Sequence, residues 1–298
     1  MTRPPLPVRD GLNPSRITMP DGGHWHTVAD YLTHRFGVAD VRRKIDAGEI
    51  VDAGGGPVTH STTYSSGAVV YLYRDPPDEA EVPFAIELIH RDETLVVADK
   101  PHFLASTPRG AHVVQTALVR LRRTLGNPDL SPAHRLDRLT AGVLLFTARP
   151  DARAAYQLLF ERREVSKTYE AIAPVNTDLT FPFVHRSRLV KQDGILAAFE
   201  VPGAPNAETE IELVESAGGL GRFLLRPRTG KTHQLRAHMN ALGMPIIGDD
   251  FYPEMAPRAI DDYSQPLQLL ARTLEFDDPF TGRARRFDSR RRLVAWPG

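Results

Sequence analysis

The sequence contains no cysteine, and this absence restricts the chemistry open to the chain. Disulfide bonds, thiolate–metal sites and cysteine nucleophiles are excluded, and a cytoplasmic location is favoured because disulfides belong to oxidising compartments. The HWH segment offers His24 and His26 as metal ligands, but no third ligand lies at a suitable spacing. No apolar run approaches the roughly 20 residues that span a bilayer, and the first residues lack an apolar signal-peptide core. We therefore expect a cytoplasmic protein without a membrane partner.

The chain also lacks an excess of charge of either sign, because its 298 residues include 37 basic and 37 acidic ones. Basic residues are nevertheless concentrated in two segments. From Lys100 to Thr140 there are seven basic residues against two acidic ones, and from Thr281 onward there are six arginines against Asp288 alone. Local concentrations of this kind suit the binding of a polyanion. Ordinary solvated arginines would produce the same pattern, so charge alone leaves both interpretations open.

Composition and hydrophobic periodicity divide the chain into four parts. Residues 1–20 are rich in proline and arginine and predict a flexible arm. Residues 21–75 predict a small α+β module, with two helices followed by short strands around a glycine turn. Residues 76–84 form a proline-rich, acidic linker. Strands and helices alternate over residues 85–298, which predicts an α+β domain with a mixed, mostly antiparallel central sheet and flanking helices.

Three segments of the larger domain have clear patterns. HVVQTALVRLRRTLG predicts an amphipathic helix with Val114, Leu118 and Leu121 on one face. GVLLFTA is a continuous apolar run, which is typical of a buried strand. KTHQLRAHMNALG predicts a helix that Gly243 ends.

The segment HRLDRLTAG carries the most informative polar residues. Asp137 lies between Arg135 and Arg138, directly before the predicted buried strand. Nearby guanidinium groups favour the ionised form of a carboxyl group, and a carboxylate nucleophile must be ionised. An isolated aspartate in this setting is more often a turn-capping residue. Asp137 by itself therefore does not establish a catalytic site.

Four segments occur in a fixed order along the larger domain: ADKPHFLASTPRG, HRLDRLTAG, SKTYEAIA and TGKTHQLRAHMNALGMPIIGDDFY. Together they resemble the RluA-type RNA pseudouridine synthase family. The resemblance implies the pseudouridine synthase fold with a central cleft, isomerisation of specific uridines in structured RNA, and no metal or organic cofactor. The N-terminal module resembles the alpha-L RNA-binding module of a ribosomal protein. We therefore expect ribosomal RNA rather than transfer RNA as the substrate, bound by a monomer.

The resemblance assigns catalytic roles to three residues. Asp137 matches the catalytic aspartate, and Arg236 of HQLR matches the arginine that pairs with it. Tyr169 of KTY matches a tyrosine that stacks on the target base, and its phenol could also remove the last proton. Taken alone, Tyr169 would be interpreted as a core residue, because it alternates with Ala171 and Ala173 along a strand.

The resemblance assigns RNA contacts to four further residues. Arg135 matches an arginine associated with flipping the target nucleotide, and His134 is the histidine beside it. Removing a base from its stack costs a few kcal/mol, and a long planar side chain such as arginine can fill the vacated space. Lys231 stands where the family has an arginine, so it keeps the charge but loses bidentate geometry. His233 completes the predicted RNA-contacting set.

Two alternatives have their own sequence requirements. A non-catalytic RNA-binding or ribosome assembly factor with the same fold would lack Asp137, Tyr169 or Arg236, and all three are present. A glycosidase usually needs two carboxylates a few ångströms apart. Asp249 and Asp250 are the candidates for such a pair, but GDDFY is better interpreted as a turn.

Overall fold

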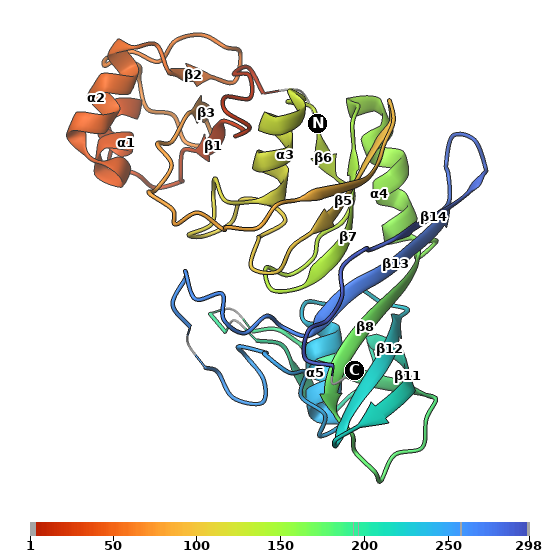
Figure 1. The fold of residues 1–298 in the computed structure, drawn as a ribbon. Coiled ribbons are helices and arrows are strands. Elements are labelled where there is room, and N and C mark those ends of the chain that lie inside the picture. The colour runs from red at the N-terminus through yellow and green to blue at the C-terminus, as the bar shows by residue number, and fades with distance from the viewer. Residues whose placement is uncertain (1–3, 193, 196, 257, 297–298) are drawn as a thin grey trace. The chain divides into compact units, whose positions relative to one another are not determined.

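The computed structural model describes residues 4–192, 194–195, 197–256 and 258–296 (Figure 1). The chain forms two compact units that divide between Asp78 and Glu79, within the expected linker. No helix in the described ranges is long and apolar enough to cross a membrane.

The N-terminal unit consists of two helices and a three-stranded antiparallel sheet. Its elements are β1 (Ser15–Thr18), α1 (Val28–Phe36), α2 (Val38–Asp46), β2 (Ile50–Asp52) and β3 (Val69–Leu72). The strand order is β1-β3-β2. Helix α1 begins at Thr27 because of a capping box: the Thr27 hydroxyl accepts from Asp30 N at 3.1 Å, and the Asp30 carboxylate accepts from Thr27 N at 2.9 Å.

Part of the expected N-terminal arm belongs to this sheet. Residues 15–18 form β1, and Ile17 and Met19 are buried in the core of the unit. The expectation of an arm over residues 1–20 was therefore wrong for its last residues. Proline and arginine dominate the composition of the segment and conceal these two alternate apolar residues, of which Ile17 pairs with β3. Residues 1–3 of the expected arm lie outside the described residues.

The larger unit is built on an eleven-stranded sheet. Its strands are β4 (Glu87–Arg91), β5 (Leu95–Lys100), β6 (Ser131–Pro132), β7 (Ala141–Thr147), β8 (Ser166–Pro174), β9 (Phe183–Val190), β10 (Phe199–Val201), β11 (Ala207–Ala217), β12 (Leu220–Pro227), β13 (Leu269–Asp277) and β14 (Ala284–Asp288). The order is β10-β9-β11-β12-β8-β13-β7-β5-β4, with β14 beside β13 and β6 beside β7. Strands β7 and β13 are parallel, and the other described pairings are antiparallel. The expected mixed, mostly antiparallel α+β fold is confirmed.

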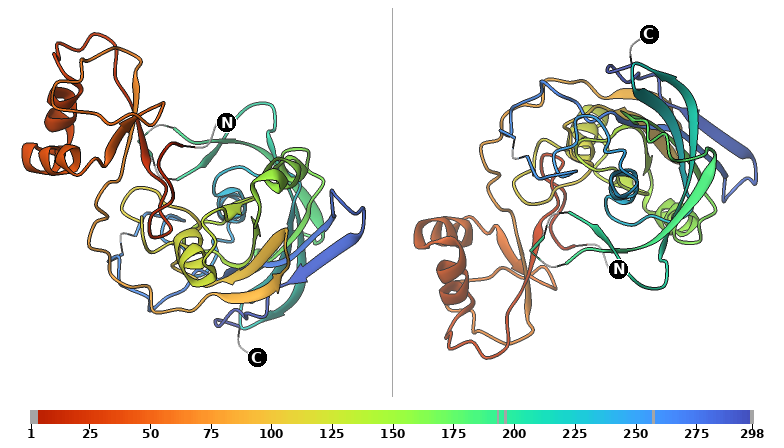
Figure 2. Two further views of the ribbon diagram at one scale, coloured as in Figure 1. Left: turned by 90° about the horizontal axis from the view of Figure 1, so that it is seen from above. Right: turned by 90° about the horizontal axis from the view of Figure 1, so that it is seen from below.

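Helices cover both faces of this sheet. They are α3 (Ala117–Leu125), α4 (Arg153–Glu161), which follows the 3₁₀ turn η1 (Pro150–Ala152), and α5 (Gln234–Ala241). Helices α3 and α5 share one core cluster, and α4 packs into a second. The sheet curves, with α5 on its inner side (Figure 2).

Strand β7 lies between these two layers. Leu144 and Phe146 belong to the cluster with α3 and α5, whereas Val143 and Leu145 belong to the cluster with α4. Burial on both faces explains why this strand is an uninterrupted apolar run rather than an alternating one.

Helix α3 is shorter than the sequence predicts, because it begins after Thr116, and Val114 is not part of it. The Glu79 carboxylate accepts from the N–H groups of Val113, Val114 and Gln115 at 2.7–2.9 Å. These bonds hold the preceding segment in a non-helical conformation. Periodicity cannot reveal such a partner, because Glu79 lies more than thirty residues earlier in the chain.

Candidate active site

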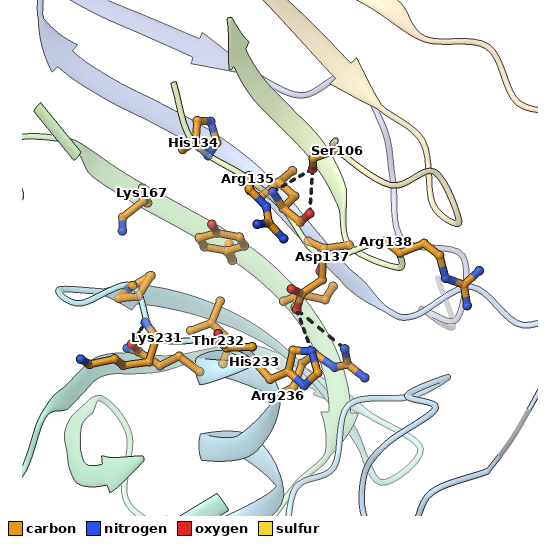
Figure 3. A pocket seen from close by; sticks show the side chains of 18 of the residues that line it. Ser106, His134, Arg135, Asp137, Arg138, Lys167, Lys231, Thr232, His233 and Arg236 are labelled. Atoms are coloured by element: carbon orange, nitrogen blue, oxygen red, sulfur yellow. Dashed lines mark hydrogen bonds and ion pairs between the residues drawn. The ribbon is translucent and has the colours of Figure 1, made fainter. Parts of the chain in front are cut away.

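The larger unit contains a cleft of about 1070 Å³ that brings all seven predicted site residues together (Figure 3). The loop before β7, strand β8 and the start of α5 supply them. They are His134, Arg135, Asp137, Tyr169, Lys231, His233 and Arg236. Segments separated by about a hundred residues in the sequence thus meet at one site.

Asp137 lies in the loop between β6 and β7, and its carboxylate is 34% exposed. Ser106 fixes the backbone beside it. The Ser106 hydroxyl donates to Leu136 O at 2.7 Å and accepts from Leu136 N at 3.0 Å. Thr140 N donates to Asp137 O at 3.2 Å and closes the turn into β7. The carboxylate therefore projects into the cleft from a loop whose backbone is held in place.

Lys100 is a second support for this loop. Its ammonium group is buried and donates to the backbone oxygens of Pro101, Leu104 and Arg138 at 3.0, 2.7 and 3.2 Å. Burial lowers the pKa of Lys100 well below its ordinary value. The sequence analysis counted Lys100 within a basic segment, but the structure gives this lysine a role in fixing the end of β5 to the loop that carries Asp137.

Arg236 approaches Asp137 from the first turn of α5, and its side chain is only 2% exposed. Nη1 lies 3.7 Å from Asp137 Oδ2. Its shorter bonds go elsewhere: Nε and Nη2 donate to the Asp249 carboxylate at 2.7 and 2.5 Å, and Nη2 also donates to Asp250 Oδ1 at 2.8 Å. Arg236 is thus anchored by Asp249, and it meets Asp137 through the remaining nitrogen.

Asp249 was interpreted from the sequence as a turn residue, and it also performs that task. Its Oδ1 accepts from Phe251 N at 2.8 Å and from Tyr252 N at 3.2 Å. Its carboxylate is fully buried, so each oxygen needs polar partners. The sequence offered a signal in the two adjacent aspartates, but not their shared partner, because Arg236 belongs to another element.

His233 lies on the other side of Asp137, with Nε2 4.0 Å from Asp137 Oδ2. It precedes α5 with a left-handed backbone (φ 53°), and its ring stacks on Phe251 at 5.2 Å between centroids. Burial lowers the pKa of His233, which favours the neutral ring. Its buried Nδ1 has no hydrogen-bond partner among the described residues.

Tyr169 lies on β8, opposite Leu225 of β12 and Ala271 of β13, and lines the cleft. Burial, followed by the charge of Asp137, raises the pKa of Tyr169 above its ordinary value. The phenol is therefore protonated in the resting site. Its ring is available for stacking, whereas the hydroxyl would have to lose its own proton before it could act as a base.

The side chains of His134 and Arg135 differ in how firmly neighbouring residues hold them. His134 Nε2 accepts from Leu145 N at 3.1 Å, and its ring stacks on Phe160 at 4.5 Å between centroids. Burial lowers the pKa of His134 to about 3, so the ring is neutral and fixed. The side chain of Arg135 is exposed and lies in the cleft (Figure 3).

The two basic segments are only partly available to a polyanion. Arg122 is buried, and its Nε donates to Leu130 O at 3.0 Å. In the tail, Arg285, Arg286 and Arg291 form ion pairs at 2.7, 2.9 and 3.3 Å with carboxylates of the same unit. The interpretation of the two segments as a polyanion-binding surface is therefore too broad, because composition does not show which cations are paired internally.

The cations that line the cleft come partly from the first basic segment and partly from elsewhere. Arg109, Arg135 and Arg138 belong to that segment. The others that surround the cleft lie outside both segments: Arg163, Lys167, Lys191, Arg228 and Lys231. These residues are scattered along the sequence, so counting charges along the chain did not find them.

Comparison with known proteins adds to this geometry. The profile of the RNA pseudouridylate synthase family matches residues 94–241. A Haemophilus influenzae protein named dual-specificity RNA pseudouridine synthase RluA is 31% identical over 220 residues, which cover 69% of this chain and 93% of that protein. The Escherichia coli K12 protein of the same name is 35% identical over 199 residues, which cover 62% of this chain and 86% of that protein.

Two solved human structures are also similar. RNA pseudouridylate synthase domain containing 4 aligns with a TM-score of 0.54 and 26% identity, over 70% of this chain and 88% of that structure. RNA pseudouridylate synthase domain containing 1 aligns with a TM-score of 0.56 and 21% identity, over 70% of this chain and 85% of that structure. The second likeness shows the shared fold.

Proposed function

This chain belongs to the RNA pseudouridylate synthase family, and from that premise we propose how its cleft performs the reaction. The chain is an RNA pseudouridine synthase, an isomerase that converts uridine in RNA into pseudouridine. The bond from the ribose to the base nitrogen breaks, the base rotates, and a bond to carbon forms in its place. The site must therefore hold a detached base and stabilise charge while the base turns.

We assign the nucleophile to Asp137. The observation that carries this assignment is the carboxylate in the cleft, 3.7 Å from a buried guanidinium that Asp249 holds in position. The positive charge of Arg236 lies beside the carboxylate, and a carboxylate can attack carbon as a nucleophile. Attack on the sugar and attack on the base are both compatible with this geometry.

Tyr169 and Arg135 are proposed to handle the flipped nucleotide. Unstacking the target costs a few kcal/mol, and stacking on an aromatic ring recovers part of it. Tyr169 supplies that ring within the cleft. Arg135, which is exposed, can enter the space that the base leaves in the RNA. Lys231 and His233 contact the adjoining backbone in this proposal.

We further propose ribosomal RNA as the substrate, bound by a monomer in the cytoplasm. The support is the resemblance of the N-terminal sequence to an RNA-binding module of a ribosomal protein, together with the two helices and small sheet that this unit forms. Mapping pseudouridines in total RNA from cells with and without the protein tests this. We expect specific ribosomal uridines to lose the modification. A loss confined to transfer RNA would contradict the choice of substrate and leave the isomerase assignment intact.

Asp137→Asn tests the nucleophile directly. An amide of nearly the same shape is a poor nucleophile, so we expect a folded protein that binds RNA and forms no detectable pseudouridine. Asp129→Asn is a matched control, because Asp129 is similarly exposed (37%) and lies outside the cleft. Product formation by the Asp137 variant at the rate of the control would refute the assignment.

A further inference from the structure

Three metal-ligating side chains meet away from the cleft. His185 comes from β9, Glu200 from β10 and His238 from α5, and their ligand atoms all lie within 4.8 Å of one another. His185 Nε2 is 2.8 Å from Glu200 Oε1, and His238 Nε2 is 3.9 Å from the same oxygen. None of the three lines the cleft. The pseudouridine synthase reaction as described above does not use them.

The ring of His238 is held so that its Nε2 atom faces the other two side chains of the cluster. His238 is fully buried, and its Nδ1 lies 3.0 Å from the Thr209 hydroxyl, which also accepts from Gln234 Nε2 at 2.9 Å. Metal-ligating histidines are usually anchored in this way through the nitrogen that does not bind the metal. His238 Nε2 is left to face Glu200, with the Ser187 hydroxyl 3.1 Å away as its other polar neighbour.

The other two proposed ligands, His185 and Glu200, are partly open to solvent. The side chains of His185 and Glu200 are 20% and 24% exposed, so an ion can reach them from solvent. The rings of His185 and His238 are nearly perpendicular (87°), with centroids 4.8 Å apart. Two imidazoles converge on one carboxylate oxygen, and the Ser187 hydroxyl beside His238 Nε2 is a candidate for a fourth ligand.

We propose that His185, Glu200 and His238 bind one Zn²⁺ ion. Zinc takes imidazole and carboxylate ligands at about 2.0–2.2 Å, which separates tetrahedral ligand atoms by roughly 3.4 Å. The distances of 2.8 and 3.9 Å bracket that value. Small rotations of the two partly exposed side chains can equalise them, whereas His238 is fixed.

The bound ion would have a structural role. It joins β9 and β10 to α5, the helix that also carries Arg236. Binding to the folded state alone stabilises that state by mass action, so zinc should raise the melting temperature. The site does not depend on the proposed roles of the cleft residues, and it can be tested without RNA.

The experiment uses the full chain after removal of metal with a chelator. Zinc is titrated in competition with a chromophoric chelator, and thermal unfolding is followed with and without zinc. We expect one saturable ion per chain from this site and a higher melting temperature. Glu200→Gln keeps the size of the side chain and a hydrogen bond to His185 but loses the charged ligand. We expect it to weaken zinc affinity at least about tenfold.

A matched control separates a metal site from ordinary histidine binding. His90 Nε2 lies 2.8 Å from Asp92 Oδ2, the same pairing as in the proposed site but without a second histidine, so His90→Asn should leave zinc affinity unchanged. All variants carry His24→Asn and His26→Asn, because those exposed histidines could bind zinc on their own.

Three outcomes would overturn the proposal. They are the absence of saturable binding, affinity that Glu200→Gln leaves unchanged, and equal losses from Glu200→Gln and His90→Asn. His185→Asn removes another of the proposed ligands. Because the side chain of His185 is partly exposed, this variant keeps the test valid if Glu200→Gln folds poorly.

Discussion

Arg236 is shared by three carboxylates, and the way they share it determines how Asp137 is held. Asp249 takes two of the guanidinium nitrogens through short, paired bonds, which fix both the position and the plane of the group. Asp250 takes one bond, and Asp137 lies beyond hydrogen-bond length at 3.7 Å. Asp137 is thus held electrostatically by a group that is oriented by other residues, so its oxygens remain available for chemistry.

Asp249→Asn should therefore impair a site that Asp249 does not itself enter. Breaking a buried ion pair costs about 3–5 kcal/mol of stability, and Asp250 and Asp137 compensate only part of the Arg236 charge. We also expect kcat to fall more than KM rises, because Arg236 would lose its orientation toward Asp137. Asp250→Asn is the matched comparison, with the same change of charge at a residue that gives Arg236 one bond. Equal effects of the two variants on stability and kcat would contradict the anchoring role.

Variants of Tyr169 can separate the role of its aromatic ring from the role of its hydroxyl group. Tyr169→Phe keeps the stacking face, so we expect it to bind target RNA as the parent does. Tyr169→Leu should lose about 1–3 kcal/mol of base contact. Binding is measured with a target RNA in the Asp137→Asn background, where no product forms. Slow turnover by the phenylalanine variant, with an isotope effect from deuterium at carbon 5 of uridine, would assign the last proton removal to the hydroxyl. If both variants bind and react like the parent, Tyr169 is a core residue.

At the scale of elements, three strands set the distance between the nucleophile loop and the stacking tyrosine. Ala271 of β13 lies opposite Gly142 of β7 on one side and Tyr169 of β8 on the other. Gly142 has a φ of 112°, and a Cβ atom there would overlap the backbone of Ala271. The glycine therefore permits the close approach of β7 and β13, directly after the loop that carries Asp137.

Gly142→Ala should destabilise the larger unit strongly. Overpacking costs about 1–3 kcal/mol, and an L-residue in a left-handed conformation costs a further 1–2 kcal/mol or so. Gly282→Ala is the control, because Gly282 also has a positive φ (67°) but a Cβ atom there would meet nothing within 4 Å. Urea unfolding followed by far-UV circular dichroism compares them. Similar losses for both variants would show that strand approach is not the cause.

The sequence predicted the elements that carry strong local patterns. The apolar run of β7 appears where expected, and the mixed sheet is confirmed. The helix expected over KTHQLRAHMNALG is present but begins only at Gln234, because His233 before it has a left-handed backbone. The sequence did not predict features set by distant partners. Glu79 delays the start of α3 by capturing three backbone N–H groups, and Asp249 anchors Arg236. Such bonds join segments that only the folded chain brings together, and no local pattern records them.

The same limit applies to charge over the whole molecule. The predicted basic segments include Lys100 and Arg122, whose cationic groups are buried against backbone oxygens. The cations that line the cleft come from several segments, and only Arg109, Arg135 and Arg138 among them belong to a predicted basic segment. Zero net charge is therefore compatible with a locally positive surface, because the acidic residues are distributed elsewhere.

We therefore expect the RNA affinity to fall as the salt concentration rises. The cations that surround the cleft should cause this dependence. Each phosphate that a cation neutralises contributes about 0.7–0.9 to the slope of log K against log salt. Lys191→Ala combined with Lys231→Ala should reduce that slope by about 1.4–1.8. Arg283→Ala combined with Arg292→Ala removes the same charge from exposed positions outside the cleft and should leave the slope unchanged. Equal slopes for the two double variants, measured by filter binding with one target RNA, would place the phosphate contacts away from the cleft.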